Sequence, residues 1–214
     1  EKSNLRNHLR LTRDSSLYFE EISMENCKTL PSGYREIFKI NLQKDKKTAV
    51  LINAMALVIM ILMLIPAFLT ADVSNVFSLF TKAYMPLVYC AVLIGGMILY
   101  MILHELVHGI FMKKFSGVKP KYGFTGLYAY AGSSAYFNRK CYIIIALAPV
   151  VIWGIVLAVL QICLWGIWAW IIYFIQIANI SGAAGDIYVT CKMSRMPENI
   201  LVNDTGIEMT IYSE

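Results

Sequence analysis

One short stretch of the sequence combines two histidines and a glutamate at helical spacing. The stretch is Leu103-His104-Glu105-Leu106-Val107-His108-Gly109. Residues four apart lie on the same face of a helix, so His104 and His108 could offer two imidazoles to one metal ion. Glu105 lies beside the first histidine, where its carboxylate could take a proton from a metal-bound water. This His-Glu-x-x-His pattern is typical of zinc peptidases, which use Zn²⁺ as their cofactor.

A tetrahedral zinc site with one open position needs a third protein ligand. The apolar stretch 141–191 contains a single formal charge, Asp186. Asp186 lies six residues before Lys192, and His108 lies five residues before Lys113, which are about 9 Å and about 7.5 Å along a helix. The similar depth favours Asp186 as the third ligand. The cysteines at the two ends of the stretch are weaker alternatives.

A second polar residue precedes this aspartate. Asn179 lies seven residues before Asp186, so the two share a face if the segment is helical. The Asn179 amide could donate to the oxyanion that forms during hydrolysis, which makes it a candidate catalytic residue beside Glu105. A hydrogen bond to a neighbouring helix is the alternative. Gly182 and Gly185 could loosen the helix at this point.

The composition is that of a membrane protein rather than of a soluble enzyme. Of 214 residues, 58% are apolar and only 15% are charged, whereas soluble domains are nearer half apolar and a quarter charged. Crossing the hydrocarbon layer takes about 20 apolar residues as a helix. Four spans are predicted, at about 49–70, 84–112, 141–163 and 168–190. A charge at mid-membrane costs about 3 kcal/mol, so Glu105 is expected to serve a function. The alternative is a structural polar face whose histidines bond to carbonyls.

Basic residues alternate between the segments outside the spans. Lys and Arg number ten before residue 49, one in the link 71–83, six in the loop 113–140, none in the turn between the last two spans and two in the tail. Basic loops stay in the cytoplasm, so both termini and the loop 113–140 are expected there, in a multi-pass protein of the cell membrane. The predicted regions are a cytoplasmic N-terminal segment (1–48), a membrane metallopeptidase domain (49–191) and a cytoplasmic tail (192–214). Because orientation accounts for much of the net charge of +5, no nucleic-acid partner is predicted.

The parts outside the membrane contain weaker patterns. In the loop 113–140 four aromatic residues alternate with small ones: Tyr122, Phe124, Tyr128 and Tyr130. This predicts a strand with one aromatic face, bent at Gly126. Such a strand could bind an extended substrate by main-chain hydrogen bonds, or the segment could be an aromatic hairpin that rests in the lipid interface. A small hairpin is predicted from 200–202 and 207–212, and a short amphipathic helix but no core in the N-terminal segment.

Several of these stretches together resemble a known family. They are HELVHG in a membrane helix, the aromatic loop, YIIIALAPVV at 142–151 and NISGAAGD at 179–186. They resemble the bacterial putative zincin peptidase family of small multi-pass membrane proteins, from about residue 95 to the C-terminus. More distantly, the chain is similar to the site-2 proteases, which cleave substrates within the membrane. Those enzymes have His-Glu-x-x-His on one helix, and an Asn followed by an Asp-Gly on a later one. Here Ile187 follows Asp186, and the proline-rich stretch of those enzymes is absent.

The expected fold is all-α transmembrane, a four-helix membrane bundle with a small cytoplasmic β element between helices 2 and 3. The expected function is a zinc-dependent intramembrane peptidase, with a membrane-protein or peptide substrate reached from the lipid bilayer. Two alternatives stay open. One is a metal-binding membrane protein, either a sensor or a non-catalytic subunit, and the other is a membrane-embedded zinc hydrolase of a non-peptide substrate. Glu105 favours hydrolysis, because a pure metal site does not need a carboxylate between its histidines.

Overall fold

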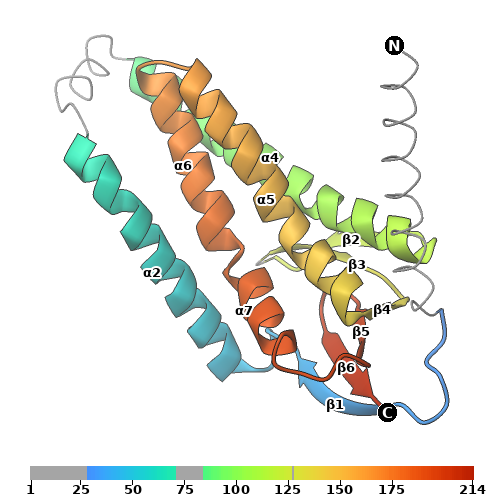
Figure 1. Ribbon diagram of the computed structural model, residues 1–214. Helices are drawn as coiled ribbons and strands as arrows, with labels where there is room; N and C mark the ends of the chain where they lie inside the picture. The colour runs from blue at the N-terminus through green and yellow to red at the C-terminus, as the bar shows by residue number, and fades with distance from the viewer. Residues whose placement is uncertain (1–27, 71–83, 127) are drawn as a thin grey trace, which may run out of the picture.

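The structure is a computed structural model that describes residues 28–70, 84–126 and 128–214, and most of these residues are helical (Figure 1). The helices are α2 (Lys46–Thr70), α4 (Met85–Ser116), α5 (Arg139–Cys163), α6 (Ile167–Gly182) and α7 (Ala184–Met193). The last two follow one another as one interrupted span. Four helical segments in the described residues are therefore long and apolar enough to cross a membrane. The prediction of four helical segments of membrane-spanning length is confirmed, and these segments are compatible with a multi-pass membrane protein.

Local sequence signals explain where α4 ends and where α5 begins. α4 continues to Ser116, four residues beyond the predicted end, because Lys113 and Lys114 fit its last turn, where cations interact favourably with the helix dipole. Gly117 then takes the left-handed conformation (φ 68°) and donates its N–H to the Lys113 carbonyl, which ends the helix. At the start of α5, the Asn138 side chain accepts a hydrogen bond from the Cys141 N–H, as an N-cap does.

The fourth span is interrupted at the glycine-rich segment. α6 ends at Gly182 and α7 begins at Ala184, with Ala183 between them. The prediction that the glycines loosen this helix is confirmed. Because of the interruption, Asp186 lies in the first turn of a new helix, where an acidic side chain is favoured by the free N–H groups and the helix dipole.

The main β-sheet is larger than predicted and lies at one end of the helices (Figure 1). Its four strands, in sheet order, are β1 (Arg35–Ile40), β6 (Met209–Ser213), β5 (Leu201–Asp204) and β4 (Tyr136–Asn138). The neighbouring strands are all antiparallel. The prediction that the β element of the bundle lies between helices 2 and 3 is therefore wrong for this sheet. Its strands come from three segments that are far apart in the sequence, and no local pattern reveals that they pair.

Other predictions for these segments have mixed outcomes. The hairpin predicted in the tail is confirmed as β5 and β6. The N-terminal segment does contribute to a core, contrary to expectation, because Ile40 of β1 is buried with Phe137, Val202 and Ile211. In the described part of that segment, residues 28–45 contain no helix, and residues 46–48 belong to the start of α2. The rest of it, where the amphipathic helix was also possible, lies outside the described residues.

A separate hairpin connects α4 to β4. It consists of β2 (Lys121–Phe124) and β3 (Ala129–Gly132). Tyr122 pairs with Ala131, and Tyr130 pairs with Gly123. Because directly paired residues share a face, the aromatic side chains of the two strands lie on opposite faces. The prediction of one aromatic face is wrong, because the chain reverses direction near Gly126 (φ 89°) instead of continuing as a single bent strand.

Glycines allow this hairpin to approach its neighbours closely. A Cβ at Gly109 of α4 would lie 2.0 Å from the Tyr122 hydroxyl oxygen. A Cβ at Gly206, in the turn between β5 and β6, would lie 2.2 Å from the Tyr130 ring. The absence of a side chain at these two positions therefore lets the hairpin contact α4 on one side and the main sheet on the other.

Candidate metal centre

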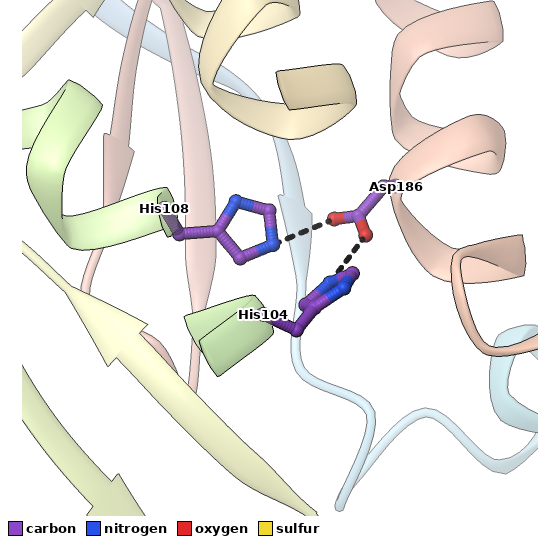
Figure 2. A group of neighbouring side chains, drawn as sticks. All are labelled: His104, His108 and Asp186. Atoms are coloured by element: carbon purple, nitrogen blue, oxygen red, sulfur yellow. Dashed lines mark ion pairs between the residues drawn. The ribbon is translucent and has the colours of Figure 1, made fainter. Parts of the chain in front are cut away.

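Three of the predicted ligands converge in the structure. His104 and His108 lie one turn apart on α4, and Asp186 faces them from α7 (Figure 2). The Nε2 atom of His104 lies 3.6 Å from Oδ2 of Asp186, and the Nε2 atom of His108 lies 3.7 Å from Oδ1. Both imidazoles are buried. Among the described residues, these three form the group whose side-chain atoms could hold one metal ion, with ligand atoms within 4.8 Å of one another.

The distances suit a zinc ion. Zinc binds imidazole nitrogen and carboxylate oxygen at about 2.1 Å, so two tetrahedral ligand atoms are about 3.4 Å apart. The observed separations of 3.6 and 3.7 Å, each to a different oxygen of Asp186, are close to this value and are too long for direct hydrogen bonds. Two neutral imidazoles and one carboxylate are also a donor set that zinc accepts. The residues present therefore fit the metal, and with three protein ligands a fourth would have to come from water or substrate.

His108 is oriented by a proline in the neighbouring helix. Its Nδ1 atom lies 2.9 Å from the carbonyl oxygen of Ile145 in α5. Inside a helix that carbonyl would normally accept from the N–H four residues later, but the residue there is Pro149, which has no N–H. With the Nδ1 hydrogen donated to this free carbonyl, Nε2 carries a lone pair toward Asp186. The proline in the YIIIALAPVV stretch thus has a physical role at the site.

His104 is oriented by a chain of side chains that leads to α6. Its Nδ1 atom lies 2.8 Å from the Tyr100 hydroxyl oxygen, and that hydroxyl donates to Oδ1 of Asn179 at 2.9 Å. Because the single hydroxyl proton of Tyr100 goes to Asn179, the tyrosine oxygen must accept from His104 Nδ1–H. Nε2 of His104 is then also left free to bind a metal. Hydrogen bonds of this kind fix the tautomer and the ring orientation of metal-binding histidines.

This chain bears on the role predicted for Asn179. The residue is fully buried, and its amide nitrogen lies 3.2 Å from the Val150 carbonyl and 3.4 Å from Oε1 of Gln176. Both amide hydrogens therefore have partners, and an oxyanion could receive one only if Asn179 exchanged a partner. The catalytic role stays a prediction. Hydrogen bonds connect Asn179 to the site through Tyr100 and His104.

A cavity of about 370 Å³ adjoins the three ligands. Glu105 lines this cavity together with His104, His108 and Asp186. The Glu105 carboxylate accepts a hydrogen bond from the backbone N–H of Ala131 in β3. The candidate base and the candidate ligands thus share one space.

The four aromatic residues predicted to bind substrate are placed differently from one another. Tyr128 and Tyr130 line the cavity. Tyr122 instead packs on Gly109 of α4, and Phe124 is 64% exposed. The structure thus brings two of the four residues to the candidate site.

Two acidic residues that line the cavity, Asp204 and Glu208, have no counterpart in the sequence predictions. Asp204, at the end of β5, lines the cavity and accepts hydrogen bonds from the Tyr142 hydroxyl and, at 2.8 Å, from the Gly206 N–H. Burial raises the pKa of the Asp204 carboxyl above its ordinary value. No local motif marks this residue, because the tail reaches the site only through the pairing of the main sheet. Tyr100, by contrast, is four residues before His104 on the same helix face, so helical spacing could have identified it.

Residues 97–201 match the model of a family described as putative zincin peptidase. The matched region contains all three candidate ligands, and the resemblance to the putative zincin peptidase family is confirmed. The more distant similarity to the site-2 proteases stays a prediction. The match indicates a metallopeptidase, with zinc as the metal of its class. No curated protein and no solved structure matches the chain.

Proposed function

Because residues 97–201 match the putative zincin peptidase family, we propose that this protein is a zinc-dependent peptidase that works within the membrane. Its substrates would be membrane-associated polypeptides. One observation carries the proposal, namely that Nε2 of His104, Nε2 of His108 and the Asp186 carboxylate converge beside Glu105 in one cavity. All of these residues lie in helices that are apolar and long enough to cross a membrane.

The chemistry assigns a task to each side chain. His104, His108 and Asp186 would hold the zinc ion, which when bound would supply a Lewis acid that acidifies water and polarises the scissile carbonyl. Glu105 would accept a proton from the attacking water as the water oxygen bonds to the carbonyl carbon. Glu105 would then pass that proton to the amide nitrogen as the carbon–nitrogen bond breaks. The hydrogen bond from Ala131 would hold the Glu105 carboxylate in position for both transfers.

The free edge of β3 supports a peptide as the substrate. Thr125 N–H donates to the Tyr128 carbonyl at 3.0 Å. In an antiparallel pair the hydrogen-bonded positions alternate, so the N–H and C=O groups of Ala129 and Ala131 point away from β2. Ala129 and Ala131 both line the cavity. The Ala131 N–H already donates to Glu105. An extended peptide could therefore add to this edge by hydrogen bonds with the N–H and C=O of Ala129 and the C=O of Ala131, beside Glu105.

The central test is the Glu105→Gln variant. Glutamine keeps the shape of the side chain but cannot accept the proton, so we expect zinc content to stay near that of the wild type. We expect cleavage to fall by about 10²-fold or more, the contribution typical of general-base catalysis. Zinc would be measured by elemental analysis of purified protein. Cleavage would be measured as new N-termini in the membrane fraction of cells that express either form.

The His104→Ala and Asp186→Ala variants complete this test, because each removes a proposed ligand and should lose both zinc and cleavage. New N-termini at wild-type levels in the Glu105→Gln cells would contradict the role of Glu105 as the base. Zinc in wild-type protein without any new N-termini would favour the sensor or non-catalytic subunit, or a hydrolase of a non-peptide substrate.

A further inference from the structure

A polar side chain in the first span has no partner in the structure. Asn53 is the one polar residue between Thr48 and Thr70 of α2. It is exposed, and among the residues that the structure describes none forms a hydrogen bond with its amide. An unpaired amide in a membrane helix costs free energy, and polar residues at such positions usually serve a function. The packing of α2 gives no reason for an asparagine here.

The position of Asn53 relates it to the metal centre. Asn53 lines the cavity that also contains His104, Glu105, His108 and Asp186. It follows Lys47 by six residues, which is about 9 Å along a helix. Asp186 precedes Lys192 by the same number of residues, so the amide and the metal ligand have a similar depth. α2 contributes none of the three candidate ligands.

Two glycines at the interruption of the fourth span line the same cavity. Gly182 and Gly185 both line the cavity, and a Cβ at either position would meet no other atom within 4 Å. Glycine lets another backbone approach closely, because no side chain stands in the way. A polypeptide main chain in the cavity could therefore approach the wall at these two glycines closely.

We propose that the Asn53 amide binds the main chain of the polypeptide substrate in this cavity, an inference that rests on the proposed peptidase function. A peptide must unwind to be cleaved, and its exposed N–H and C=O groups then lack partners in the membrane. An asparagine side chain has a carbonyl acceptor and two N–H donors, which is the complement of a peptide group. Asn53 can thus pair with the substrate from α2, while the free edge of β3 pairs with it beside Glu105.

The test compares two zinc-binding probes on the zinc-loaded protein. Acetohydroxamate binds the metal but has no peptide chain, whereas N-acetyl-trileucine hydroxamate adds three peptide groups. Asn53→Leu should weaken binding of the peptide probe by about tenfold, as the loss of buried hydrogen bonds predicts. It should leave the Kd of acetohydroxamate and the zinc content unchanged. Calorimetric titration in detergent measures both constants, and Asn53→Ala checks that the bulk of leucine is not the cause.

Gln161→Leu is the matched control, because it also removes a side-chain amide from a membrane helix. Gln161 lies in α5, sixteen residues after Ile145. The Gln161→Leu variant should change neither constant. Equal affinity of wild type and Asn53→Leu for the peptide probe would overturn the inference, and so would an equal loss for both probes. Failure of the proposed function would look different, because wild-type protein would then bind the peptide probe no more tightly than acetohydroxamate. That result would overturn the inference as well.

Discussion

The two histidines would present the same atom to the metal for different reasons. His108 donates from Nδ1 to a backbone carbonyl in α5, and His104 donates from Nδ1 to a hydroxyl on its own helix. In each case the opposite nitrogen, Nε2, faces Asp186. The tautomers are therefore set before a metal arrives, which lowers the cost of ordering the ligands. The hydroxyl of Tyr100 can be removed by mutation, so its contribution can be measured.

The Tyr100→Phe variant should weaken zinc binding by about 10- to 100-fold, the range found when such outer hydrogen bonds are lost. The aromatic ring remains, so the fold should be retained, but His104 loses the acceptor that fixes its tautomer. Competition with a zinc-binding dye measures the affinity. Tyr89→Phe is the matched control, because Tyr89 also lies on α4 but its ring contacts Trp168 rather than His104. Unchanged zinc affinity in Tyr100→Phe would show that Tyr100 does not orient His104.

Two helices are irregular at the places where the site needs them to be. In α5 a proline leaves the Ile145 carbonyl free for His108. In the fourth span the interruption at Ala183 places Asp186 in the first turn of α7. A regular helix at either place would satisfy its own backbone and offer less to the metal centre. The irregularities thus connect the sequence of these elements directly to the ligand geometry.

Replacing Pro149 by alanine should make α5 a regular helix at this point and weaken zinc binding at the site. The new residue would supply an N–H to the Ile145 carbonyl, and this N–H would then compete with His108. We expect helix stability to rise and zinc affinity to fall by about tenfold, as for other lost outer hydrogen bonds. Thermal unfolding and zinc titration measure the two effects. Pro66→Ala, in α2, is the control that changes a helical proline outside the cavity lining. A more stable Pro149→Ala protein with wild-type zinc affinity would contradict the role given to the free carbonyl.

The sequence predicted the elements whose signals are local. The lengths of the apolar stretches predicted the four spans, and helical spacing placed His104 and His108 on one face. The similar distances of Asp186 and His108 from the nearest lysine along their helices favoured Asp186 as the third ligand. Signals that depend on distant pairing were out of reach. β1 and β4 join the tail hairpin only through hydrogen bonds between segments far apart in the chain, so neither the main sheet nor Asp204 at the cavity could be inferred. For the segment of β2 and β3, a single strand and an aromatic hairpin both stayed open, because its aromatic residues keep alternating through the turn.

At the scale of the whole molecule, the main sheet restricts how the chain can cross a membrane. β1 precedes the first span, β4 lies between the second and third, and β5 and β6 follow the fourth. Hydrogen bonds connect all four strands in one sheet. These three segments must therefore lie on the same side of the membrane, with an even number of crossings between them. The argument depends on strand pairing alone and is independent of the charge counts.

The charge counts then predict which side this is. Basic residues are concentrated in the segments that form the sheet, so we expect the sheet to be cytoplasmic and the link 71–83 to be on the opposite side. A fluorescent protein fused after Glu214 should therefore fluoresce, and alkaline phosphatase inserted in the link should be active. A cysteine at the exposed Lys119, in a background without other cysteines, should react with a membrane-impermeant maleimide only in inside-out vesicles. Labelling of this cysteine on the same side as the link would contradict both the sheet and the four-span topology. If this cysteine and the tail were both found outside the cell, the pairing of the strands in one sheet would still agree with the result. Only the orientation inferred from the basic residues would then be contradicted.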